Sequence, residues 1–93
     1  MKYIIEKKKK FKKNLKKCRQ RGLNIELLDN VIFQLANGQQ LSSKYNDHKL
    51  WNSNKYAGCR ECHIEPDWLL IYKIVDNKLI LTLTDTGSHS DLF

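Results

Sequence analysis

The sequence has few residues that interrupt secondary structure: one proline and four glycines among 93 residues. A chain of this length forms one domain, and so few breakers leave no place for a long linker, so we expect a single domain over residues 1–93. There is also no apolar run near the 18 residues of a membrane-spanning helix, and no apolar segment of the signal-peptide kind. We therefore expect a cytoplasmic protein with no membrane partner.

Acidic residues are almost absent from the first 21 positions, where Glu6 is the only acid among eleven lysines and arginines and the net charge is +10. The other 72 residues carry a net charge of −3. A cationic segment this dense attracts polyanions such as nucleic acids. The alternative is a solvated helix face without a ligand. We favour an RNA contact, and the candidate side chains are Lys8, Lys9, Lys12 and Lys13.

Hydrophobic spacing in the N-terminal half predicts a short strand followed by two helices. Residues 3–5 are an apolar run of the strand type. Between residues 7 and 21, Phe11, Leu15 and Cys18 recur at intervals of four and three, which is helical spacing. A second helix is expected after the N-cap residue Asn24. Its predicted buried stripe consists of Leu27, Leu28, Val31, Ile32 and Leu35.

The C-terminal half predicts strands. Residues 39–57 are polar and irregular, with Leu41, Tyr45, Leu50 and Trp51 as expected anchors. Strand-like runs cover residues 59–65, 68–75 and 78–83, and Asp76-Asn77 has the composition of a two-residue hairpin loop. The predicted fold is α+β: a single antiparallel β-sheet of about four strands with two N-terminal helices packed on one face, in the order βααβββ.

The segment Cys59-Arg60-Glu61-Cys62-His63 has the spacing of a haem-attachment motif or of half a zinc site. Strand residues three apart point to opposite faces, so Cys59 and Cys62 would diverge, whereas both kinds of site need converging sulfurs. No second such pair supplies the remaining zinc ligands. We therefore predict buried structural cysteines, no disulfide, no cofactor and no metal.

Histidine is scarce, with three in the chain: His48, His63 and His89. A lone histidine is usually structural or solvated. Three of them, with Asp67, fall near expected strand ends in a basic protein, and imidazole is the side chain suited to moving protons near neutral pH. Taken alone, the residues leave the structural and the catalytic interpretations about equally favoured.

Three stretches carry a resemblance to a known family: DHKL (47–50), CRECHIEPDWLLIYK (59–73) and TGSHSDLF (86–93). They resemble the YafQ group of the RelE/ParE toxins of bacterial type II toxin–antitoxin systems. The motifs H-x-E-P-D-W and G-[ST]-H-x-x-L-F are specific, and they lie in the C-terminal half. The N-terminal half is similar in element order and charge alone.

This resemblance implies an mRNA endoribonuclease that works in the ribosomal A site. It implies attack of a ribose 2′-hydroxyl on the adjacent phosphate without a metal. Contact with ribosomal RNA is predicted separately, from the +10 charge of the N-terminal segment. It also implies a cognate antitoxin protein that folds partly on binding and represses the shared operon.

The positions that match the family's catalytic residues are His48, His63, Asp67 and His89. We assign His48 as the base and His89 as the acid, and the reverse assignment stays open. His63 and Asp67 would position the phosphate or tune the other histidines. Trp68 and Phe93 are candidates for stacking on an RNA base, against the alternative of core packing.

One residue departs from the family pattern. Asp85 stands two residues before the tail glycine, where relatives tend to carry an arginine. A carboxylate there is expected to repel the phosphate and slow the reaction. Arg60, Lys44 and Lys49 are the candidates to supply the missing positive charge.

A second class of function stays open: a non-catalytic RNA- or ribosome-binding module, or a ParE-like toxin, neutralised by an antitoxin. A purely binding protein has no need for three histidines and an aspartate together, so the enzyme is favoured.

Overall fold

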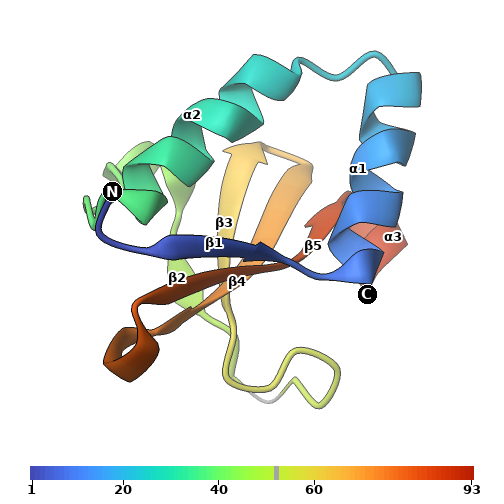
Figure 1. The fold of residues 1–93 in the computed structure, drawn as a ribbon. Helices are drawn as coiled ribbons and strands as arrows, with labels where there is room; N and C mark the ends of the chain where they lie inside the picture. Colours follow the sequence, from blue (N-terminus) through green and yellow to red (C-terminus); the bar gives the residue numbers. More distant parts are fainter. Residues whose placement is uncertain (52) are drawn as a thin grey trace.

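The computed structural model describes residues 1–51 and 53–93 and contains one sheet with helices on both of its faces (Figure 1). The elements in chain order are β1 (Ile4–Lys7), α1 (Lys9–Gln20), α2 (Ile25–Ala36), η1 (Ser43–Tyr45), β2 (His48–Lys49), β3 (Arg60–Glu65), β4 (Trp68–Val75), η2 (Asp76–Lys78), β5 (Ile80–Gly87) and α3 (His89–Leu92). No helix in the described ranges is both long and apolar enough to span a bilayer.

The sheet has five strands in the order β1-β5-β4-β3-β2. β1 runs parallel to β5, with Ile4 opposite Ile80, and the other neighbours are antiparallel. The α+β class was predicted correctly, whereas an antiparallel sheet of about four strands was wrong. The parallel pair forms because β1, the first strand, lies beside β5, the last strand, and runs in the same direction. The additional strand, β2, has two residues, too few for an alternating pattern in the sequence.

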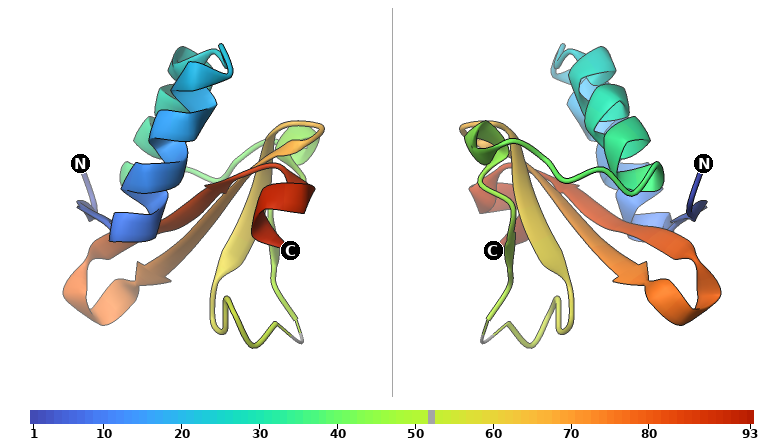
Figure 2. Two further views of the ribbon diagram at one scale, coloured as in Figure 1. Left: turned by 90° about the vertical axis from the view of Figure 1, so that its right-hand side faces the viewer. Right: turned by 90° about the vertical axis from the view of Figure 1, so that its left-hand side faces the viewer.

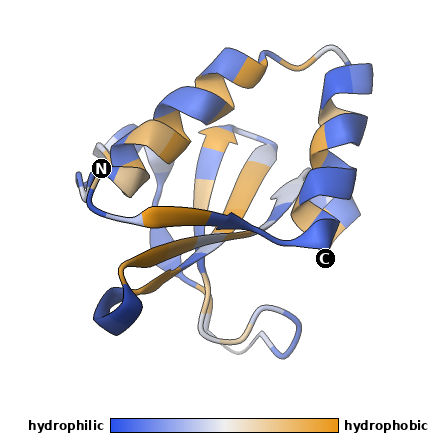
Figure 3. Ribbon diagram, in the orientation of Figure 1, coloured by the Kyte–Doolittle hydropathy of each residue, from blue (hydrophilic) through white to orange (hydrophobic). Residues whose placement is uncertain are grey.

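Helices α1 and α2 cover one face of the sheet, and α3 lies against the other (Figure 2). Helix α1 buries Phe11 and Cys18, while most of its remaining surface is hydrophilic (Figure 3). Helix α2 begins at the predicted cap, where the side chain of Asn24 accepts a hydrogen bond from the Glu26 amide at 3.1 Å. The buried stripe of α2 is narrower than predicted, because Leu27 is 41% exposed.

The central strand β4 buries side chains on both faces. Leu70 and Tyr72 pack with the helices α1 and α2, whereas Leu69 and Ile71 pack with the cluster around α3. The segment before β3 is anchored differently from the prediction, since Trp51 is 76% exposed.

The cysteines behave as predicted. Cys62 lies in the core under α1 and α2, and Cys59 lies in the cluster on the opposite face. Both are buried, as is Cys18, and all three are free thiols. The two sulfurs of the C-x-x-C segment therefore diverge, which is incompatible with haem attachment at that segment.

The last strand is longer than predicted. The 76–77 hairpin loop is instead a 3-10 turn, η2, followed by Leu79 in the left-handed region at φ 51°. Strand β5 then continues to Gly87 instead of stopping at residue 83. Its second half contains Thr84, Asp85 and Thr86, and these polar residues hide the strand from a hydrophobic pattern. This extension carries the chain to the site described next.

Candidate functional site

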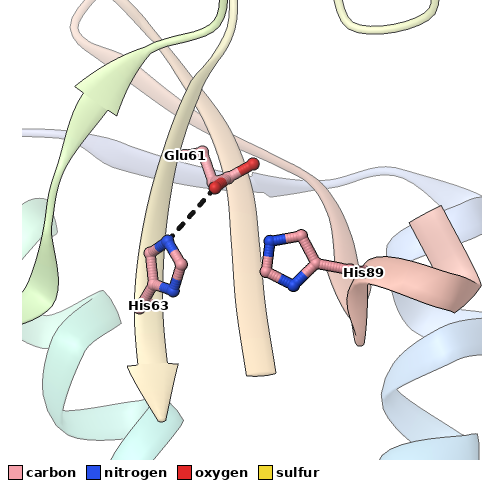
Figure 4. A group of neighbouring side chains, drawn as sticks. All are labelled: Glu61, His63 and His89. Carbon is pink, nitrogen blue, oxygen red and sulfur yellow. Dashed lines mark ion pairs between the residues drawn. The ribbon is translucent and has the colours of Figure 1, made fainter. Parts of the chain in front are cut away.

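Three imidazoles form a row on the face of the sheet that carries α3. They come from three elements: His48 from β2, His63 from β3 and His89 from α3. The ring centroids of His48 and His63 are 6.4 Å apart, and those of His63 and His89 are 5.8 Å apart. Figure 4 shows His63 and His89 facing one another from their two elements. The structure thus gathers three residues that the sequence spreads over more than forty positions.

His89 is held by Asp67, from the turn between β3 and β4. The backbone amide and Nδ1 of His89 both donate to Oδ1 of Asp67, at 3.0 and 2.8 Å. These hydrogen bonds, first the one from the backbone amide and then the one from the ring, lower the pKa of Asp67. Because a carboxylate accepts, the proton lies on Nδ1 of His89, and Nε2 is left to exchange a proton with a ligand.

His63 lies between two acceptors. Its Nε2 is 3.3 Å from Oε1 of Glu61, and its Nδ1 is 3.3 Å from the carbonyl oxygen of Pro66. A neutral ring satisfies one of these contacts, whereas an imidazolium satisfies both. The ring of His63 is thereby held between Glu61 and Pro66, with the side-chain amide nitrogen of Asn46 3.5 Å from Nε2.

Glu61 is the buried centre of the site. Its side chain is 7% exposed, and Nε2 of His48 lies 3.7 Å from the same Oε1 that contacts His63. The other ring nitrogen of His48 lies 2.7 Å from the carbonyl oxygen of Asn46 and therefore donates. A buried carboxylate needs polar partners, and two imidazoles lie within ion-pair distance of it.

The residues Glu61 and Asn46 were missed by the sequence analysis. Glu61 had a usable signal, because it lies two residues before His63 and so shares its face of the strand. Asn46 had none, since its role depends on a left-handed backbone at φ 47° that places its carbonyl under His48.

Helix α3, which carries His89, is fixed by short polar contacts. Ser88 and Asp91 form a capping box at its start. The carboxylate of Asp91 also receives two hydrogen bonds from Arg21, which follows α1. A Cβ atom at Gly87 would lie 2.9 Å from Oδ2 of Asp91, so a glycine is required immediately before the helix.

The two aromatic candidates for base stacking differ in exposure. Phe93 is 59% exposed, and its ring centroid lies 6.4 Å from that of His89 and 5.6 Å from that of Tyr56. Trp68 is 2% exposed, and its indole nitrogen donates to Thr86 at 3.0 Å. The base contact predicted for Trp68 is therefore wrong, because the ring is enclosed in the core, and Phe93 remains a candidate.

Neither Asp85 nor Arg60 faces the histidine row. Asp85 is fully buried and accepts hydrogen bonds from Asn14 at 2.6 Å and Tyr56 at 2.7 Å, with the ammonium group of Lys10 at 3.3 Å. Direct repulsion of a phosphate by this enclosed and neutralised carboxylate was a wrong expectation. Arg60 pairs with Asp47 and, by strand alternation, lies on the face opposite Glu61 and His63.

The lysines predicted to bind RNA lie apart from the histidine row. Lys9, Lys12 and Lys13 are exposed on α1, which covers the other face of the sheet. Lys8 immediately precedes α1 and lies 3.4 Å from Glu6.

Three side chains at the site could hold a metal ion. One ligand atom from each of Glu61, His63 and His89 lies within 4.8 Å of the other two. Two imidazole nitrogens and a carboxylate oxygen form a donor set that suits zinc or copper. The sequence analysis considered a metal at the cysteines and did not anticipate this group.

Residues 3–93 match the family described as the bacterial YafQ toxins of type II toxin–antitoxin systems. The chain belongs to the YafQ toxin family. A curated family relative, the mRNA interferase toxin YafQ of Escherichia coli (strain K12), is 37% identical over 90 residues, which span 96% of this chain and 94% of the relative. The family resemblance read from the sequence is thereby confirmed.

Solved structures of similar proteins have the same fold. A metal-bound toxin from Helicobacter pylori has a TM-score of 0.89 and 44% identity, with 98% of this chain and 99% of that chain covered. A chain of the E. coli DinJ–YafQ complex has a TM-score of 0.87 and 36% identity, with 98% of each chain covered. The whole chain, including the site, therefore has the architecture of this toxin family.

Proposed function

We propose that this YafQ-family toxin is an endoribonuclease that cuts mRNA in the ribosomal A site and so inhibits translation. Its curated relatives are mRNA interferases. The observation that carries the proposal is the row of three imidazoles with Glu61 and Asp67 on one face of the sheet. Such a row offers proton donors and acceptors within the span of one phosphodiester.

In the proposed reaction, the ribose 2′-hydroxyl attacks the adjacent phosphorus, a P–O bond forms, and the bond to the departing 5′-oxygen breaks. His48 takes the proton of the 2′-hydroxyl, and His89, entering the step as an imidazolium, gives its Nε2 proton to the departing oxygen while Nδ1 keeps its hydrogen bond to Asp67. His63, positioned by Glu61, donates a hydrogen bond to the phosphate and so stabilises the negative charge that grows on it. Phe93 stacks on a base next to the cut.

Asp67 has a supporting role in this scheme. Its hydrogen bond to Nδ1 of His89 fixes the orientation of the ring and directs Nε2 toward the substrate. Because its hydrogen bonds to His89 lower the pKa of Asp67, the carboxylate remains charged at neutral pH.

No metal is needed for this chemistry. An ion bound by Glu61, His63 and His89 would supply a Lewis acid, but it would also occupy nitrogen atoms that the proposed proton transfers use. The assay is therefore run in EDTA, and cleavage is expected to continue there.

The proposed partners follow from the family. A relative was solved as the DinJ–YafQ complex, and we propose that a cognate antitoxin binds this chain too. Ribosomal RNA is the proposed partner of the α1 lysines. The cytoplasm is the compartment in which such a function operates.

The test is to map cut sites on a translated message with the wild type, His89→Gln and the control Ser90→Ala, an exposed neighbour on α3. We expect the wild type and the control to cut equally, and His89→Gln to cut about 10²- to 10⁴-fold more slowly. Equal cutting by all three would refute the role of His89. Growth arrest by the wild type without any cut message would instead favour the alternative, a non-catalytic RNA- or ribosome-binding or ParE-like toxin.

A further inference from the structure

A second cationic feature lies on the same face of the sheet as the histidines. It is a groove of about 430 Å³, which we name the lysine groove. Its charged lining consists of Lys8, Lys55, Lys73, Lys78 and Glu6. Figure 2 shows that the segment just before β3 and the turn between β4 and β5 extend toward the same end of the molecule.

The charge in this groove is mostly unneutralised. Glu6 forms an ion pair with Lys8, at 3.4 Å. Among the described residues, Lys55, Lys73 and Lys78 form no ion pair, and all three are exposed. Ammonium groups concentrated in a groove repel each other, and a polyanion relieves that repulsion with release of its counterions.

Positive charges lie close together at the end of the groove formed by Tyr56. The ammonium groups of Lys10 and Lys55 lie 5.4 and 5.3 Å from the centre of the Tyr56 ring. The neighbouring ammonium group of Lys10 is the main cause that lowers the pKa of Lys55, because a second positive charge disfavours the protonated form. The buried carboxylate of Asp85 holds Lys10 and Tyr56 in this arrangement, at 3.3 and 2.7 Å.

The groove is continuous with the histidine row. Tyr56 lines it, and the Tyr56 ring contacts Phe93, which lies next to His89. Lys73 is two residues from Ile71, the β4 residue opposite Glu61, and two strand residues span about 7 Å. Lys73 and Glu61 therefore occupy adjacent positions along one surface.

We propose that the lysine groove binds the phosphodiester backbone of single-stranded RNA next to the phosphate that is cut. The inference rests on the proposed function, in which RNA is the substrate. It assigns binding roles to Lys55, Lys73 and Lys78, and it supplies positive charge on a chain that has Asp85 in place of the family's arginine. An RNA strand is favoured over an acidic protein segment because the groove runs directly into the row of imidazoles.

The test uses Lys73→Gln/Lys78→Gln, with Lys2→Gln/Lys7→Gln as the control of equal charge. Lys7 follows Glu6 in β1 and so points away from the groove, and Lys2 is exposed beside Tyr3. Lys55 is left intact because its ammonium group donates to the carbonyl of Leu92 in α3. Binding of a labelled twelve-nucleotide RNA is measured by fluorescence anisotropy at several salt concentrations.

We expect the double substitution in the groove, Lys73→Gln/Lys78→Gln, to weaken RNA binding about ten-fold at low salt. The slope of log K against log salt should fall by about 1.4, which is about 0.7 for each lost phosphate contact. The control pair should change the affinity by less than about two-fold, since it removes charge away from the strand. A dinucleotide, which occupies the cutting position alone, should bind equally to all three proteins.

Equal weakening by the two pairs would overturn the proposal, because net charge and not the groove would then set affinity. So would unchanged RNA binding combined with weaker binding of the purified antitoxin. If the wild type cuts message while Lys73→Gln/Lys78→Gln binds RNA normally, the role of the lysine groove is refuted and the proposed function is supported. If Lys73→Gln/Lys78→Gln loses RNA binding but the wild type never cuts message, the role of the lysine groove is supported and the proposed function is refuted.

Discussion

At the scale of single residues, Glu61 shows how burial shapes the site. Its carboxylate has almost no access to water and is compensated by His48 and His63 through one oxygen. A buried charge of this kind orients its partners because the contacts are expensive to break. We therefore regard Glu61 as a positioning residue that holds the rings of His48 and His63 in place.

Replacing Glu61 with glutamine tests this role. The amide has the shape of the carboxylate but no charge, so it holds the ring of His63 less firmly and we expect cleavage to slow about 10²-fold. Glu65→Gln removes an exposed carboxylate from the same strand and should cleave normally. Cleavage rates on a translated message are compared with thermal unfolding of each variant. Equal rates for Glu61→Gln and the wild type would contradict the role of Glu61.

Sequence motifs identified His48, His63, Asp67 and His89, which the structure brings to one face. These residues belong to short sequence motifs that can be recognised without knowledge of the fold. The burial of Trp68 was not evident from its motif, because burial depends on which strand lies in the centre of the sheet.

At the scale of elements, α3 is short and depends on contacts with the rest of the chain. Four residues cannot form a stable helix by themselves. The capping box of Ser88 and Asp91, with the ion pair from Arg21, holds α3 and therefore His89 in place. The ion pair thus links the end of α1 to the histidine row.

Asp91→Asn is expected to lower the free energy of unfolding by about 1 kcal/mol at pH 7, a figure reduced for the partial exposure of the pair. Hydrogen bonds from Arg21 are the main cause that lowers the pKa of Asp91, so the folded state binds fewer protons than the unfolded state. The stabilisation is therefore present above the ordinary value of 3.8 and is lost as the pH falls below it.

Urea unfolding at pH values between 7 and 2.5 measures this effect. The difference between the wild type and Asp91→Asn should shrink as the pH falls, whereas Asp29→Asn, an exposed position on α2, should differ little at any pH. A difference that stays constant down to pH 2.5 would show that the carboxylate charge contributes nothing.

Helices were predictable at this scale because twelve-residue amphipathic patterns and the Asn24 cap are local signals. The two-residue strand β2 and the polar second half of β5 were not. Their strand conformation comes from hydrogen bonding to β3 and β4, which no local pattern records.

At the scale of the whole molecule, positive charge lies on both sides of the sheet. Lys9, Lys12 and Lys13 lie on α1, over one face, and the lysine groove lies on the other. In the proposed function, this separation would let one side of the toxin contact the ribosome while the other holds the message.

The triple variant Lys9→Gln/Lys12→Gln/Lys13→Gln is expected to weaken association with ribosomes and to reduce the salt slope by up to about 3, about 0.9 for each contact. Co-sedimentation with ribosomes across salt concentrations provides the measurement. Binding of the short RNA should stay close to that of the wild type. An unchanged slope for ribosome binding would assign α1 to another partner, such as the antitoxin.

The position of β5 between β1 and β4 has a consequence for the nascent protein. Until residues 80–87 leave the ribosome, the first strand has no neighbour to pair with, and α1 lacks the strand beneath it. Such distant pairing delays folding, because the ends of a long loop must meet first. Since His89 follows β5 directly, the sheet and the histidine row are completed at the same stage of synthesis. A partly synthesised chain therefore lacks both the complete sheet and His89.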